Sequence, residues 1–130
     1  MKLMSKEEII SQYETSGKIM FEEIHDGNWK KHDKEGAKLL KIFKMFEKNP
    51  DFAMECIDEL LKSKNVVVRS KGAAYCLALK RNIETGVRIL EEISRDPSYR
   101  LYQLNAEMTL KVWREKGELQ LYPPKQQHNL

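Results

Sequence analysis

The sequence predicts an all-α fold in which about three antiparallel helical hairpins stack into a solenoid. Residues that cap or end helices recur at intervals of roughly 15 to 20 residues, and the apolar residues between them keep helical spacing. No two runs of alternating β-branched residues occur that could pair as strands. A chain of 130 residues with 41% apolar residues can bury one core, so a single domain is expected over residues 1–118.

The first helix is expected to begin at a capping box and to end at a glycine. Ser5 is followed three residues later by Glu8, a pair that can satisfy two backbone N–H groups reciprocally. Gly27 can adopt the left-handed conformation that ends a helix. Ser16 and Gly17 interrupt the apolar face of this helix. That face consists of Ile9, Ile10, Tyr13, Met20 and Ile24.

Two asparagines mark the starts of the next two helices. Asn28 is the expected N-cap of a helix that stops before Asn49, and Asn49 with Pro50 then starts the third helix. The expected apolar face of the second helix is Trp29, His32, Leu39, Leu40, Phe43 and Phe46, with Trp29 in the core. The expected face of the third helix is Ala53, Cys56, Ile57, Leu60 and Leu61.

The stretch NVVVRSKGAAYCLAL, residues 65–79, is expected to be the fourth helix. Three consecutive valines suggest a strand, but the sequence offers no partner strand, and Asn65 is a further N-cap. Tertiary packing overrides the modest helix propensity of valine. The residues that then share one helical face are Val68, Gly72, Tyr75, Cys76 and Leu79.

The last two helices are expected to start at Asn82 and at Asp96-Pro97, and the sixth to end at Gly117. The expected apolar residues of the fifth are Ile83, Val87, Leu90 and Ile93. Residues 119–130 contain Pro123-Pro124 and are expected to form an extended tail.

Two of the helix pairs resemble each other at an offset of 31 to 32 residues. Residues 57–61 correspond to 89–93, and residues 65–69 correspond to 96–100. Helical pairs repeating at such a period indicate a stacked α-solenoid, because one pair alone cannot bury its apolar faces.

The sixth helix carries two apolar stripes on roughly opposite sides. One consists of Leu101, Leu104, Met108 and Val112, and the other of Tyr102, Ala106, Leu110 and Trp113. No repeat follows to cover the outer side. One hypothesis is that the tail covers the second stripe through Leu119, Leu121 and Tyr122. Alternatively, this stripe is a docking surface for a partner or for a second copy of the chain.

The fourth and sixth helices resemble those of HEAT-type repeats. The Val68-Arg69 step and the small residues Gly72, Ala73 and Ala74 resemble the second helix of such a repeat. A family of small bacterial HEAT-like proteins is similar to the longer stretch that includes Asn65, residues 106–110, Trp113 and residues 117–118. The resemblance as a whole covers residues 28–118. The resemblance implies a HEAT-like fold and, because such proteins include immunity partners of polymorphic or contact-dependent toxins, a toxin domain as partner.

No residue pattern indicates catalysis, a metal or a cofactor. His25-Asp26 and His32-Asp33 repeat a dipeptide, but no third ligand follows at metal spacing. The paired carboxylates suit solvated helix faces, and the sequence has neither a Gly-rich phosphate loop nor a nucleophile turn. An enzyme is therefore not expected.

A cytoplasmic location is expected from the termini and the cysteines. The N-terminus turns acidic at once and lacks the apolar core of a signal peptide, and no apolar run could span a membrane. Cys56 and Cys76 lie among apolar helix formers and are expected to be buried thiols.

The charge distribution leaves two classes of partner open. All six arginines follow Asn65, where the net charge is +4, whereas residues 1–64 carry −1. A protein partner is the favoured hypothesis, and nucleic acid is the alternative, weakened by acidic residues interleaved with the arginines. A HEAT-like module for a small molecule rests on the fold alone. On the fourth helix Arg69, Lys71 and Lys80 are expected to point outward. The residues expected to contact a partner are Arg69, Lys71, Arg100, Tyr102, Gln103 and Arg114.

Overall fold

The computed structural model describes residues 4–123, apart from the side chain of His25, and this part of the chain is all-helical. The helices are α1 (Lys6–Asp26), α2 (Trp29–Lys48), α3 (Pro50–Leu60), α4 (Val66–Leu79), α5 (Ile83–Ser94) and α6 (Leu101–Lys116), with a 3₁₀ turn η1 (Pro97–Tyr99) before α6. The prediction of an all-α chain is confirmed, and residues 4–123 include no strand.

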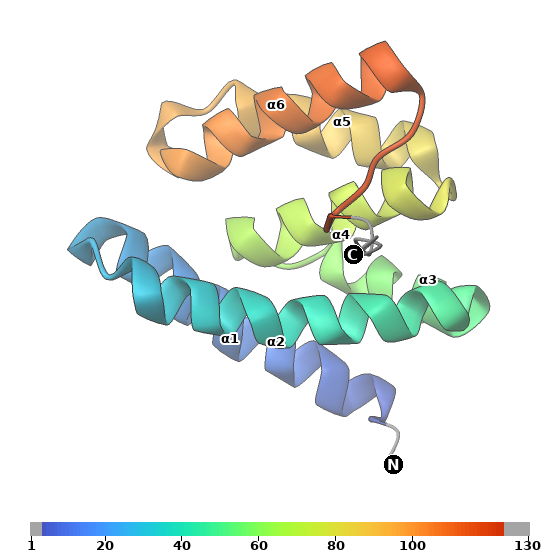
Figure 1. Cartoon of the computed structure of the whole chain (residues 1–130), viewed down its shortest axis with the longest axis horizontal. Coiled ribbons are helices and arrows are strands. Elements are labelled where there is room, and N and C mark those ends of the chain that lie inside the picture. Colours follow the sequence, from blue (N-terminus) through green and yellow to red (C-terminus); the bar gives the residue numbers. More distant parts are fainter. Residues whose placement is uncertain (1–3, 124–130) are drawn as a thin grey trace, which may run out of the picture.

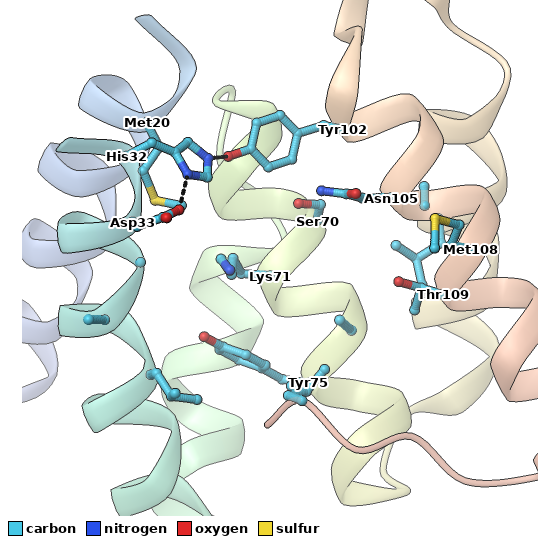
Figure 2. Close-up of a pocket in the computed structure, with 17 residues that line it drawn as sticks. Met20, His32, Asp33, Ser70, Lys71, Tyr75, Tyr102, Asn105, Met108 and Thr109 are labelled. Carbon is cyan, nitrogen blue, oxygen red and sulfur yellow. Dashed lines mark hydrogen bonds and ion pairs between the residues drawn. The ribbon is translucent and has the colours of Figure 1, made fainter. Parts of the chain in front are cut away.

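The helices form three packed pairs that lie one above another (Figure 1). α1 packs on α2, α3 on α4 and α5 on α6, and α4 lies at the centre, where it contacts α1, α3, α5 and α6. The second helices of the pairs, α2, α4 and α6, lie side by side and share one face of the stack (Figure 2). This repeat-like arrangement agrees with the predicted stack of hairpins.

Local sequence determines most helix ends. The Ser5 hydroxyl accepts from the Glu8 N–H at 3.1 Å, and the Glu8 carboxylate accepts from the Ser5 N–H at 3.0 Å, which completes the capping box. Gly27 and Gly117 end α1 and α6 with positive φ angles of 73° and 69°. Asn65 Oδ1 accepts from the N–H groups of Val67 and Val68, so the three valines begin a helix.

The start of the last helix differs from the prediction. Asp96 Oδ1 accepts from the Ser98 N–H at 2.9 Å and from its hydroxyl at 2.6 Å, and these two bonds stabilise the short 3₁₀ turn instead of a first α-helical turn. Arg100 then breaks the helix with φ 53° and ψ −118°, so α6 begins at Leu101. Asp96-Pro97 therefore does not repeat the role of Asn49-Pro50.

The apolar stripe of α6 that was expected on the outer side faces the stack, and the other stripe contains the exposed residues. Tyr102, Ala106 and Leu110 are buried, because this stripe faces the rest of the stack. On the other side Leu104 is 54% exposed and Met108 is 65% exposed. The second stripe is therefore core, and the first stripe contributes the exposed apolar residues.

The prediction that Trp29 belongs to the core is also wrong. Trp29 is 52% exposed, whereas the residues of α2 that are buried in the core, among them Leu39, Phe43 and Phe46, lie further along the helix. Its indole meets the ring of His32 edge-on, with 5.8 Å between centroids.

Ser16 and Gly17, which interrupt the apolar stripe of α1, are required by packing. A Cβ on Gly17 would lie 2.6 Å from Val68 Cγ2, so glycine lets α1 approach α4 closely. The Ser16 hydroxyl donates to the carboxylate of Glu35, which is 5% exposed, at 2.8 Å, and Lys38 donates to the same group at 2.9 Å. Burial alone would raise the pKa of Glu35, but these two hydrogen bonds and the positive charges of Lys38 and Lys34 together outweigh it and lower the pKa.

Two tyrosines bond to each other at the centre of the core. The hydroxyls of Tyr13 and Tyr75 are 2.7 Å apart, and the Tyr13 hydroxyl lies 3.3 Å from the carbonyl oxygen of Leu39. Because a carbonyl only accepts, Tyr13 donates to Leu39 and Tyr75 donates to Tyr13. Burial raises the pKa of both phenols, so both remain protonated and both hydrogens are used.

This direction of bonding predicts unequal effects of removing the two hydroxyls. Tyr13→Phe leaves the Tyr75 hydroxyl buried without an acceptor and should cost about 1 to 3 kcal/mol of unfolding free energy. Tyr75→Phe leaves Tyr13 bonded to Leu39 and should cost only about 1 kcal/mol. Urea unfolding of the two variants measures the difference, and equal losses would contradict the assigned direction.

Candidate functional site

The face shared by α2, α4 and α6 contains a groove of about 640 Å³ (Figure 2). α2 and α6 form its walls, and α4 forms its floor. The lining is mixed in chemistry, with methionine, leucine and alanine side chains beside polar and charged ones. Its volume is within the range of pockets that bind ligands.

His32 and Tyr102 close one end of the groove. His32 Nε2 lies 2.8 Å from the Tyr102 hydroxyl, and His32 Nδ1 lies 3.3 Å from Asp33 Oδ1. Because the carboxylate only accepts, Nδ1 carries the imidazole hydrogen and the Tyr102 hydroxyl donates to Nε2. Burial raises the pKa of Tyr102, which keeps this donor protonated. The bond ties α2 to α6 (Figure 2).

Residues 118–123, here called the strap, cross the other end of the groove. The strap leaves α6 after Gly117 and passes α4 toward α2 (Figure 1). Leu121 lines the groove, and the Tyr122 hydroxyl donates to the carboxylate of Glu47 on α2. The Tyr122 ring also lies 4.7 Å below Lys44 Nζ. The described part of the predicted tail therefore reaches α2 instead of covering the Tyr102 stripe of α6. Residues 124–130 of that tail lie outside the described residues.

Lys71 lies on the floor between these two ends. It projects from α4 and is only partly exposed, through the groove (Figure 2). Within residues 4–123 its ammonium group has no hydrogen bond and no ion pair. Burial lowers its pKa, and no neighbouring carboxylate offsets this effect. The carboxylate of Asp33, which also lines the groove, lies 3.3 Å from His32 Nδ1.

An unpaired and partly buried ammonium group should cost stability, so Lys71→Met should raise the unfolding free energy by about 1 kcal/mol. Because the folded state lowers the pKa of Lys71, the unfolded chain binds more protons at alkaline pH. Stability contributed by this group therefore rises with pH toward the unfolded pKa of about 10.4. This rise should disappear in Lys71→Met. Thermal unfolding at pH 7 and pH 9.5 tests the prediction, with the exposed Lys111→Met as control.

The structure brings only two of the six predicted contact residues together. Lys71 and Tyr102 line the groove, whereas Arg69 lines a different surface with residues of α3 and α5. Arg100 is exposed at the break before α6, and Lys80, expected to point outward, is exposed at the end of α4. The six residues therefore do not share one surface.

Three of the remaining predicted residues make contacts within the chain. Arg69 donates to the Ser63 carbonyl and to the Tyr99 hydroxyl, both at 3.1 Å. Gln103 donates to the Ser94 carbonyl at 3.1 Å. Arg114 forms an ion pair with Glu91 at 2.8 Å.

Sequence reasoning missed most of the groove. The helical spacing places His32 on the apolar face of the second helix, but its bond to Tyr102 joins residues 70 positions apart, and no local pattern reveals such a pair. Asn105 and Thr109 were not singled out. Their spacing of four residues, next to Ala106, is the signal that could have placed them on one side of α6.

Residues 4–123 contain no cluster of three or more His, Cys, Asp and Glu side chains arranged to hold a metal ion. Across those residues, no helix combines the length and the apolar character that crossing a membrane requires. Cys56 and Cys76 are both buried in the core.

Comparisons with protein-family models, curated proteins and solved structures find no match for this chain.

Proposed function

We propose that this chain is a protein-binding module, not an enzyme, and that the groove between α2, α4 and α6 is its contact surface. One observation carries the proposal. Two of the three large apolar side chains that are exposed within residues 4–123, Trp29 and Met108, lie at this groove, and the third, Leu104, lies on α6 outside its lining. Met108 lines it, Leu104 precedes Met108 by one helical turn, and Trp29 lies against His32 of the closed end.

Exposed apolar residues gathered around a groove favour a protein partner. Trp and Met are enriched at the centres of protein interfaces, and a buried tryptophan often dominates the binding energy. A rigid helical scaffold that exposes apolar residues beside a groove can bind a partner without a large rearrangement of its backbone.

The charges support nucleic acid less well. Duplex binding needs a row of free cations along the contact surface. Here Arg81, Arg88 and Arg114 form ion pairs with Asp51, Glu92 and Glu91, and Arg69 is held by Ser63 and Tyr99. The groove itself offers Lys71 as its unpaired cation among the described residues.

The resemblance to small HEAT-like proteins adds a specific form of this proposal. In that form the chain is a cytoplasmic immunity protein that binds a bacterial toxin domain. The surface around the groove of this chain would cover the cleft in which the toxin, for example an RNase, binds its substrate. Inhibition would then be steric.

Co-expression tests the proposed function. The chain is produced with the C-terminal domain encoded by the reading frame directly upstream in its native host. A stoichiometric complex that survives moderate salt and restores growth to poisoned cells is the expected result. Trp29→Ser combined with Met108→Ser should weaken the complex by tenfold or more, whereas Arg88→Ser on α5 should not.

A chain that instead co-purifies with nucleic acid, released steeply by salt, would reject the protein-binding proposal.

A further inference from the structure

We propose that the groove receives a glutamate or aspartate side chain of the protein partner, with its carboxylate against the ammonium group of Lys71. This inference rests on the proposed function and specifies the chemistry of the partner. Three features of the groove support it: the unpaired charge of Lys71, the side chains that line the groove with it, and the closed ends.

The charge of Lys71 lacks a counterpart within residues 4–123. Two other lysines, both of α2, do have partners: Lys38 contacts Glu35, and Lys44 lies over the Tyr122 ring. Among the described residues, Asp33 is the only one whose carboxylate lines the groove, and it contacts His32. An entering carboxylate would supply the missing charge and would gain a charge-assisted hydrogen bond in a partly desolvated place.

The side chains around Lys71 suit the rest of an acidic residue. Asn105 and Thr109 of α6 and Ser70 of α4 line the same groove as Lys71 and provide polar groups there (Figure 2). Ala37 and Leu40 on α2 and Met108 on α6 provide apolar surface for the methylene groups and for a neighbouring residue of the partner.

The two ends of the groove limit the length of the occupant. The His32–Tyr102 bond closes one end and the strap crosses the other, so a long helix cannot lie along the groove. A volume of about 640 Å³ still exceeds that of one side chain. The geometry therefore favours a short projecting segment, such as a loop tip with an acidic residue. Residues 124–130 contain no aspartate or glutamate, so their side chains cannot supply the carboxylate.

The first experiment uses two blocked amino acids as probes. N-acetylglutamate N-methylamide and its glutamine counterpart differ only in charge and hydrogen bonding at the side-chain end. Each is titrated into the full chain, labelled with ¹³C at methionine methyl and lysine Cε positions, and binding is followed by NMR. The glutamate probe should shift Lys71 Cε and the Met108 methyl with an affinity in the range of about 1 mM or weaker.

Charge recognition should separate the probes and the variants. The glutamine probe should bind at least tenfold more weakly, as should the glutamate probe to Lys71→Met, because a hydrogen bond to a charged group is lost. Lys111→Met, an exposed lysine of α6, should bind like the parent chain. Equal binding of the two probes, or unchanged binding to a folded Lys71→Met, would overturn the inference.

A second experiment separates the inference from the proposed function. If the upstream toxin domain forms a complex, Lys71→Met should weaken it by tenfold or more, and one acidic residue of the toxin changed to its amide should reproduce this loss without adding to it. A complex unaffected by Lys71→Met keeps the protein-binding function and overturns the inference. If the glutamate probe binds but no protein complex forms, a protein partner is not the source of the carboxylate. The site would then be assigned to a small carboxylate compound.

Discussion

Replacing Phe43 by alanine should lower the free energy of unfolding by about 3 to 5 kcal/mol. The Phe43 ring is 1% exposed and stacks on the Tyr75 ring, with 4.6 Å between centroids. It also meets the ring of Tyr122 edge-on at 6.4 Å. The substitution therefore removes a contact shared by α2, α4 and the strap, and it leaves a cavity that rigid helices cannot fill.

Urea unfolding followed by circular dichroism measures this loss. Phe52→Ala on α3 is the matched control, because its ring is only half-buried, and it should cost clearly less. The Phe43 variant should also expose the strap, so proteolysis near residues 118–123 should be faster than in the parent chain. A loss no greater than that of Phe52→Ala would show that the three-way contact does not hold the stack together.

Replacing Gly86 by alanine should destabilise the chain by about 2 kcal/mol although alanine favours a helix. A Cβ at this position would lie 2.8 Å from the carbonyl oxygen of Ala73 and 3.0 Å from the Cβ of Cys76. The first of these atoms belongs to the backbone of α4, so α5 would have to move away from it. That movement should loosen the contact between the second and third pairs of helices.

Gly36 provides a control of opposite sign. It lies inside α2, and a Cβ there would meet only the terminal methyl of Met20 at 3.5 Å, an ordinary contact. Gly36→Ala should therefore stabilise the chain by up to about 1 kcal/mol through helix propensity. Thermal unfolding of the two variants measures both effects. If both replacements stabilised the chain, the result would contradict the close approach of α4 and α5 at Gly86.

The sequence predicted the helices well because their ends depend on neighbouring residues. The capping box at Ser5, the glycine at 27 and the cap at Asn65 each act within about four positions of the chain. The start of α6 was missed because Asp96 can cap either a helix or a tighter turn. Only the complete fold, with Arg100 in its unusual conformation, selects the turn.

The groove was predicted less well because it depends on contacts between distant residues. A helical pattern shows that α6 has two apolar stripes, but not which one faces the stack. For the same reason Trp29 was placed in the core: spacing assigns a face, whereas burial also depends on where a neighbouring helix ends. Among the residues predicted to bind a partner, Lys71 and Tyr102 line the groove, and Arg69, Gln103 and Arg114 serve contacts that no local pattern reveals.

The two contacts that close the ends of the groove affect the order in which parts of the chain can fold. They join residues 70 and 75 positions apart, His32 with Tyr102 and Glu47 with Tyr122. In an open array each hairpin needs only the one before it. Here Phe43 leaves the ribosome well before Tyr75 and Tyr122, so the first hairpin emerges with a large aromatic ring uncovered. The nascent chain should therefore gain its final surface only when the strap has been synthesised, and it should fold more slowly than an open array of the same length.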